Sequence, residues 1–348
     1  TLEPTTSMAL VIGAGLIIAI CSATQDITID ALRIEQIDRD DNKAMAAGAA
    51  VAVVGWWSGY KLGGMLALMM ADYLQKAGIA DYWQMTFLFL GVLVVLCNIA
   101  LMFVPETGTA ERAASQRAAQ DAMADKMGGQ GPVVKLFSFV VTTVLDPLLS
   151  FFRKNGMQIG IMILAFIFLF KIGEAFMGKM SIVFYKEVGF SKSDIALYSK
   201  GLGWITTVTF TLIGGFFALR TGVVRALLIS GIAMAGTNIL FSVLAWVGPN
   251  ELLFAFAVIV DDLAAAFATV AFVTFISLLV DRNYTATQYA LLASIGTLGR
   301  TLLASSSGAL VDGLGGDWGL FFILTAIMVI PSLLLLWKLR QKLQNLAK

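Results

Sequence analysis

Residues 82–104 read YWQMTFLFLGVLVVLCNIALMFV, an apolar run without a single charged side chain. A helix needs about 20 such residues to cross the ~30 Å hydrocarbon core of a bilayer. This run is therefore predicted to span a membrane, and it decides the class of the fold, an all-α integral membrane protein.

The rest of the chain has the same character. Of its 348 residues, 58% are hydrophobic and only 14% are charged, whereas soluble domains carry about 25% charged residues. The mean hydropathy is +0.84, and a soluble protein this apolar would expose large hydrophobic patches. The 33 glycines suit close helix packing in a lipid bilayer. The net charge of +1, without a basic face, gives no sign of a nucleic-acid partner.

Nine segments are predicted to be transmembrane helices by length and apolarity. They are 7–31, 44–73, 82–104, 157–180, 193–219, 222–247, 251–280, 284–312 and 318–338. Several are longer than the bilayer requires, so we expect helix tilt or interfacial ends.

A tenth apolar stretch, 133–152, carries polar residues at helical spacing. These residues are Lys135, Ser138, Thr142, Asp146 and Ser150. They predict one water-facing stripe on an amphipathic helix that lies on the membrane surface.

Lysine and arginine predict the orientation. With the N-terminus outside, sixteen of the 24 basic residues fall in cytoplasmic segments, five in outer segments and three within spans. Cytoplasmic loops carry the excess of positive charge, so the C-terminus is expected to be cytoplasmic.

The longest polar break divides the chain into three parts. Residues 1–104 hold three spans, 105–156 form a cytoplasmic linker, and 157–348 hold six spans. Many transporters are built from two six-helix halves of three-helix repeats. We therefore expect an incomplete six-plus-six bundle whose first three helices precede Thr1; a natural nine-span protein is the alternative.

Ionisable groups within spans are costly and usually functional. The first span carries Gln25, Asp26 and Asp30; the two aspartates are one helical turn apart, and Asp30 is also placed to pair with Arg33. We expect Asp26 and Asp30 to be candidates for proton coupling.

Two later spans add charges of both signs. Lys171 and Glu174 are three residues apart on one helix face, where they can form an ion pair or a switchable site. Asp261 lies near mid-span beside Asp262, and the two side chains are expected to diverge by about 100°. Arg300 requires either a carboxylate partner, Glu174 or Asp261, or an anionic ligand.

Aromatic and small residues alternate in the second span, where Trp57 belongs to a Trp-Trp-x-x-Tyr cluster. These rings can stack on a sugar or simply pack against other helices. The chain has no histidine, and no catalytic triad, metal-binding motif or phosphate-binding loop is visible. We therefore expect neither an enzyme nor a cofactor.

Four stretches resemble one transporter family. SATQDITIDALRIE at 22–35, FLFKIGEAF at 168–176, VVRALLISGI at 223–232 and ATQYALLASIGTLGR at 286–300 resemble helices four, seven, nine and eleven of AmpG-like muropeptide permeases. That family is a branch of the major facilitator superfamily. The second span departs from the family pattern, because GYKLG follows an unusual GWWS.

The resemblance implies a function and a set of site residues. It implies a proton-driven importer of anhydro-muropeptides, which are sugar–peptides, across the inner membrane of Gram-negative bacteria. By matching motif, Gln25, Lys171, Gln288 and Arg300 become expected substrate contacts. Trp57 joins them from its aromatic cluster, whose rings can stack on a sugar, and not from a motif match. Asp26, Asp30, Glu174 and Asp261 become expected proton-coupling residues.

Other functions stay open at this point. A transporter of the same fold could carry an acyl-CoA, a sugar or a drug, and a receptor or scaffold would not transport at all. We expect a monomer with protons and a small molecule as its partners.

Overall fold

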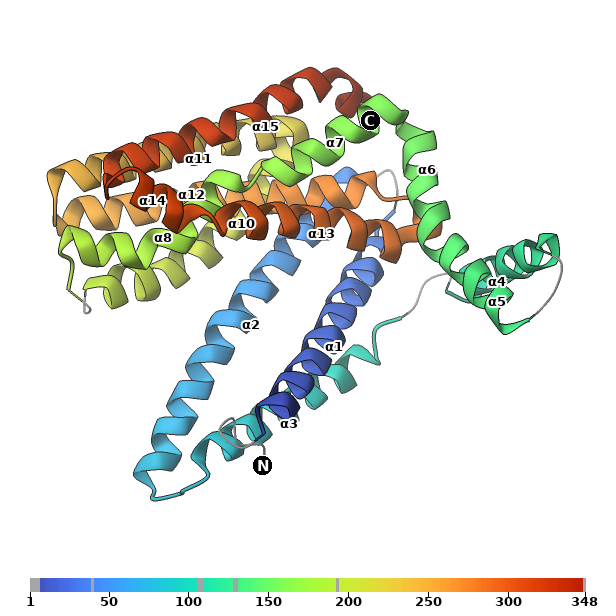
Figure 1. The fold of residues 1–348 in the computed structure, drawn as a ribbon, viewed down its shortest axis with the longest axis horizontal. Coiled ribbons are helices and arrows are strands. Elements are labelled where there is room, and N and C mark those ends of the chain that lie inside the picture. The colour runs from blue at the N-terminus through green and yellow to red at the C-terminus, as the bar shows by residue number, and fades with distance from the viewer. Residues whose placement is uncertain (1–6, 39–40, 106–108, 128–130, 192–193, 347–348) are drawn as a thin grey trace.

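The computed structural model describes residues 7–38, 41–105, 109–127, 131–191 and 194–346. This described part of the chain is helical and contains no β-strand (Figure 1). Figure 1 shows a long helical bundle from which a separate three-helix arm projects.

The arm consists of the first three helices. They are α1 (Met8–Glu35), α2 (Asn42–Lys76) and α3 (Tyr82–Leu101), and their bounds agree with the first three predicted segments within a few residues. The side chain of Asp41 caps α2 by accepting a 2.8 Å hydrogen bond from the backbone N–H of Ala44.

The linker forms a helical hairpin and then a bent helix. Its elements are α4 (Thr109–Lys126), α5 (Pro132–Val140), the π-helical turn η1 (Val141–Leu145) and α6 (Asp146–Asn155). Gly156, with φ +79°, separates α6 from the next helix, a conformation that glycine adopts without steric cost. Figure 1 shows α5 and α6 running across the end of the bundle rather than alongside its helices.

The predicted water-facing stripe of this segment is wrong for two of its residues. Ser138 and Thr142 are buried, and their hydroxyls donate 2.8 Å bonds to the backbone carbonyls of Val134 and Ser138. A hydroxyl that bonds to its own helix needs no water. Leu136 and Phe139 are exposed instead. Residues 132–155 are also long and apolar enough to cross a membrane, whereas we had expected a surface helix.

The bundle contains the six predicted C-terminal spans. Its elements are α7 (Met157–Leu169), α8 (Ile172–Val188), η2 (Ile195–Leu202), α10 (Gly203–Thr221), α11 (Val223–Val247), α12 (Glu251–Leu279), η3 (Arg282–Tyr284), α13 (Thr285–Ala304), α14 (Ser307–Gly313) and α15 (Trp318–Leu346). The predicted span 157–180 is two helices, α7 and α8, and it continues to Val188.

By length and apolarity alone, eight helical segments among the described residues qualify as membrane spans. The linker segment 132–155 is one of them, while α2 and α13 are not. The chain is thus a multi-pass membrane protein, and the nine predicted spans match the helices of the arm and the bundle.

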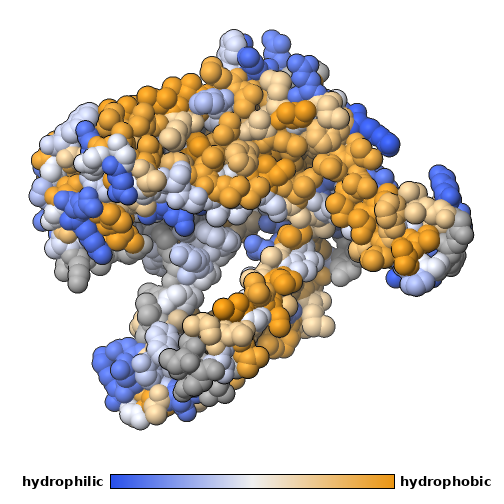
Figure 2. Space-filling view, viewed as in Figure 1, coloured by the Kyte–Doolittle hydropathy of each residue, from blue (hydrophilic) through white to orange (hydrophobic). Residues whose placement is uncertain are grey.

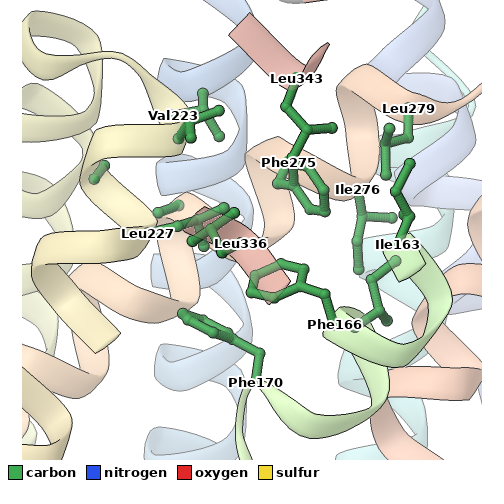
Figure 3. Packing of buried hydrophobic residues seen from close by; sticks show 14 of the residues in the cluster. Ile163, Phe166, Phe170, Val223, Leu227, Phe275, Ile276, Leu279, Leu336 and Leu343 are labelled. Carbon is green, nitrogen blue, oxygen red and sulfur yellow. The ribbon is translucent and has the colours of Figure 1, made fainter. Parts of the chain in front are cut away.

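The bundle core consists of tightly packed apolar side chains. Figure 3 shows Phe166 of α7, Phe170 directly after α7, and Leu227, Phe275 and Leu336 of α11, α12 and α15. The rings of Phe166 and Phe275 meet edge to face with centroids 5.4 Å apart. Because lipid tails are as apolar as these side chains, close van der Waals packing rather than escape from water holds the helices together.

The arm joins the bundle at one end only. Ile34 of α1 and Met45 and Ala46 of α2 belong to the same packed cluster as the bundle core. Nearby, a Cβ atom at Gly215 would lie 2.6 Å from the Cβ of Ala50. Glycine at this position therefore lets α10 and α2 approach closely.

Beyond this contact the arm and the bundle diverge. Figure 2 shows an open space between them, and Tyr60 on α2 has a relative exposure of 69%. The result is a V-shaped cleft that is closed at the end where α1 finishes and α2 begins.

Candidate substrate and ion-binding site

Lys171 lies at a break in the bundle. Helix α7 ends at Leu169 and α8 begins at Ile172, and Lys171 between them has the non-helical dihedral angles φ −100° and ψ 17°. Broken helices in transporters place polar groups at mid-membrane sites. Glu174 follows in the first turn of α8, where the helix dipole favours a negative charge.

The predicted Lys171–Glu174 pair is confirmed. The ammonium of Lys171 donates to Oε2 of Glu174 at 2.7 Å and to the hydroxyl of Thr269 on α12 at 2.6 Å. The Lys171 side chain is only 6% exposed and that of Glu174 is 22% exposed. Removing one partner of such a buried pair leaves an uncompensated charge, which typically costs about 3–5 kcal/mol.

Asp261 and Asp262 diverge as the helix geometry requires. Asp261 accepts a 2.8 Å hydrogen bond from Thr237 on α11. Asp262 instead accepts from two threonines of α10, Thr206 and, at 3.3 Å, Thr207. The two carboxylates therefore connect α12 to different neighbouring helices. Asp261 also lies within electrostatic range of Lys171 and Glu174.

Arg300 completes the charged cluster from α13. It lies within electrostatic range of Lys171, yet its side chain is exposed. Within the described residues it forms no ion pair with Glu174 or Asp261, the two partners considered from the sequence. An exposed guanidinium with free donors can bind an anionic ligand bidentately.

The candidates on α1 lie on the other side of the cleft. Asp26 is exposed. Gln25 donates a 3.0 Å hydrogen bond to Oδ1 of Asn98 on α3, and both residues line an open groove of 430 Å³. The groove is lined by α1 and α3 alone, so the observed contacts of Gln25 are within the arm.

Asp30 belongs to the contact between the arm and the bundle. Its carboxylate pairs with Arg33 at 3.0 Å, as the sequence suggested. Arg33 also donates a 3.1 Å hydrogen bond to Ser277 of α12, and Tyr289 of α13 lies next to both charges. Asp30 is thus at the closed end of the cleft, away from Lys171.

Gln288 and Trp57 are both packed into the structure. The Gln288 amide accepts from the backbone N–H of Asp281 at 2.7 Å and donates to the carbonyl of Pro147 at 2.8 Å. It therefore attaches the linker to the bundle. Trp57 is partly buried and packs with Val53 and Val270.

Three threonines that bond the charged side chains were not predicted from the sequence. Thr206, Thr237 and Thr269 each bond a charged side chain from a different helix. A hydroxyl near mid-span was the available signal, although many such hydroxyls bond only their own backbone. Among the described residues, no cluster of three or more His, Cys, Asp or Glu could hold a metal ion.

Comparisons with known proteins agree with this architecture. The Major Facilitator Superfamily profile matches residues 2–302. The putative transporter AmpG 4 of Rickettsia conorii is 30% identical over 327 residues, which cover 94% of this chain and 72% of that protein. The anhydromuropeptide permease of Escherichia coli K12 is 31% identical over 346 residues, which cover 99% of this chain and 62% of the permease.

Solved structures share the fold at low sequence identity. The proton:xylose symporter XylE superposes with a TM-score of 0.60 at 16% identity, covering 88% of this chain and 66% of that one. The human organic anion transporter MFSD10 gives a TM-score of 0.52 at 19% identity, covering 89% of this chain and 67% of that one. From the profile match and the relatives that share about a third of its residues, the chain belongs to the major facilitator superfamily as an AmpG-like permease.

Proposed function

We propose that the chain is a proton-coupled secondary transporter that imports anhydro-muropeptides across the bacterial inner membrane. The observation that carries the proposal is the buried Lys171–Glu174 pair at a break in a bundle helix, with Asp261 and Arg300 beside it. The Escherichia coli relative named as an anhydromuropeptide permease supports the choice of substrate.

The charges suit an anionic passenger. Arg300 is exposed and free of carboxylate partners among the described residues, so it would meet a substrate carboxylate first. Lys171 would be the second cation, and it is released when Glu174 is neutralised by a proton. Substrate and proton would then both favour the conformation in which the Lys171–Glu174 pair is broken. Each ligand would shift the population toward that conformation because it binds that conformation more tightly.

The closed end of the cleft indicates how the protein is oriented in the membrane. It contains Arg33 and the start of α2, the region that the distribution of lysine and arginine places in the cytoplasm. The cleft would therefore open to the periplasm, and the C-terminus would be cytoplasmic. In this state, Asp26 on the arm and Asp261 in the bundle are further candidates for carrying the proton.

Uptake of labelled anhydro-muropeptide tests the proposal. It should be measured in cells that lack their own permease, with and without a proton gradient, for the wild type and for Glu174→Gln and Asp261→Asn. We expect gradient-dependent uptake by the wild type and at least a tenfold loss in Glu174→Gln, with normal membrane insertion.

Two outcomes would reject parts of the proposal. Uptake that survives collapse of the proton gradient would remove proton coupling. Failure of unlabelled anhydro-muropeptide to compete, alongside uptake of a sugar, an acyl-CoA or a drug, would reassign the substrate while keeping the transporter.

A further inference from the structure

Two exposed aromatic rings lie on α2 above its contact with the bundle. The rings of Trp56 and Tyr60 are stacked, with centroids 5.7 Å apart and planes within 8° of parallel. Trp56 is 53% exposed and Tyr60 is 69% exposed. They differ in this from Trp57, which is partly buried against Val53 and Val270.

The two rings continue the helix face that contacts the bundle. Residues three, four and seven positions apart lie on one face of a helix. Trp56 and Tyr60 are three and seven residues beyond Val53, which packs against Val270 of α12. Because the face that touches α12 at Val53 is exposed at Tyr60, the two helices have separated there. The stacked rings therefore stand on the wall of the cleft.

Helix geometry also gives the depth of these rings. Both helices contact the shared core cluster at the closed end of the cleft, α2 in its first turn at Met45 and α12 at its last residue, Leu279. With a rise of about 1.5 Å per residue, Tyr60 lies about 10 Å beyond Val53 and Asp262 about 12 Å beyond Val270. Thr269, the partner of Lys171, is adjacent to Val270. Lys171 and Thr269 are thus about level with Val53, and Asp261 and Asp262 are about level with Tyr60, so the two rings lie within the depth range that the charged groups span.

We propose that Trp56 and Tyr60 form the binding surface for the sugar ring of the substrate, while the cations across the cleft bind its carboxylates. Flat, partly exposed aromatic faces bind the apolar C–H face of a pyranose, and ligand sites combine such rings with a few placed charges. A sugar–peptide carries both features in one molecule. This inference rests on the proposed function, and it assigns the sugar contact to Trp56 and Tyr60 of the aromatic cluster rather than to Trp57.

Calorimetric binding of anhydro-muropeptide to the purified full chain in lipid nanodiscs tests the inference. We expect Trp56→Ala to weaken binding by about tenfold, the effect of losing one aromatic contact. Trp56→Phe keeps a ring and should bind within about threefold of the wild type by the same reasoning. The matched control is Trp83→Ala, because Trp83 on α3 is also exposed and stacks on the ring four residues later, Phe87.

Competition by the free peptide portion identifies what the rings contact. In the wild type, the intact ligand should compete better than the peptide alone, and this advantage should shrink in Trp56→Ala. Equal binding by Trp56→Ala and Trp83→Ala, or an unchanged advantage of the intact ligand, would overturn the inference. If the wild type itself binds no anhydro-muropeptide, the proposed function fails instead.

Discussion

The ammonium of Lys171 lies 2.6 Å from the hydroxyl of Thr269, so the break between α7 and α8 is joined directly to α12. The same ammonium lies 2.7 Å from Glu174. One buried cation therefore connects a broken helix, a carboxylate and the helix that carries Asp261. We therefore expect changes in the Lys171–Glu174 pairing to be transmitted to α12 through Thr269.

Replacing Thr269 by valine removes the hydroxyl and preserves the shape. A hydrogen bond to a charged group contributes about 1.5–3 kcal/mol, so we expect at least a tenfold fall in uptake efficiency with the fold intact. Thr274→Val is the matched control, because among the described residues the Thr274 hydroxyl, also on α12, bonds the carbonyl of Val270 in its own helix and no charged group. Initial uptake rates and thermal unfolding in detergent check both variants. Equal uptake by the two would remove Thr269 from the mechanism.

The Lys171–Glu174 pair is expected to matter for transport more than for stability. Glu174→Leu alone should lower stability by about 3–5 kcal/mol, because it leaves Lys171 buried without its carboxylate. The double variant Lys171→Met, Glu174→Leu should recover most of this loss, since apolar pairs often replace buried ion pairs without cost. Uptake should stay absent in both variants. Thermal unfolding provides the stability measurement, and recovery of uptake in the double variant would contradict the prediction.

The contact of Gly215 with Ala50 is expected to control closure of the arm on the bundle. Gly215→Val places atoms where the Cβ of Ala50 already lies, at 2.6 Å from the added Cβ. Overpacking of this kind costs about 1–3 kcal/mol. It should lower the population of molecules in which α2 and α10 are in contact, as they are in this structure. Distances between spin labels on α2 and α10 report the shift.

A compensating change sharpens this test. Gly215→Ala adds only the clashing Cβ and should shift the distances in the same direction as Gly215→Val. Ala50→Gly in the same chain as Gly215→Ala removes the other methyl group of this contact and should restore the wild-type distances. If Gly215→Val leaves the distance distribution unaltered, α2 and α10 do not pack as described.

Gln288 is expected to stabilise the linker, in contrast to the substrate contact inferred from the family motif. Gln288→Ala leaves the carbonyl of Pro147 and the N–H of Asp281 without their partner, at a cost of about 1–3 kcal/mol for each unsatisfied group. Limited proteolysis should cut the linker 105–156 faster in this variant. Calorimetry should find ligand affinity within twofold of the wild type, whereas a large loss of affinity with normal protease resistance would favour the substrate role.

Particular residues show how far the sequence could predict the site. The ion pair of Lys171 with Glu174, and that of Asp30 with Arg33, followed from spacing on one helix. The partners of Gln288 did not, because Pro147 is distant in sequence and only the folded linker brings it close. The burial of Ser138 and Thr142 was missed for a similar reason, since periodicity defines a polar face without saying what covers it.

By itself, the sequence determined that the chain is helical and membrane-spanning, because apolar length and backbone hydrogen bonding in lipid allow little else. It also predicted which charges fall within the spans. Only the tertiary structure decided which of those charges meet: Lys171, Glu174 and Asp261 share one cluster, while Asp30 lies at the closed end of the cleft. The physical reason is that helix–helix contacts depend on close packing at positions such as Gly215 and Ala50, and side-chain periodicity along one helix carries no information about its neighbour.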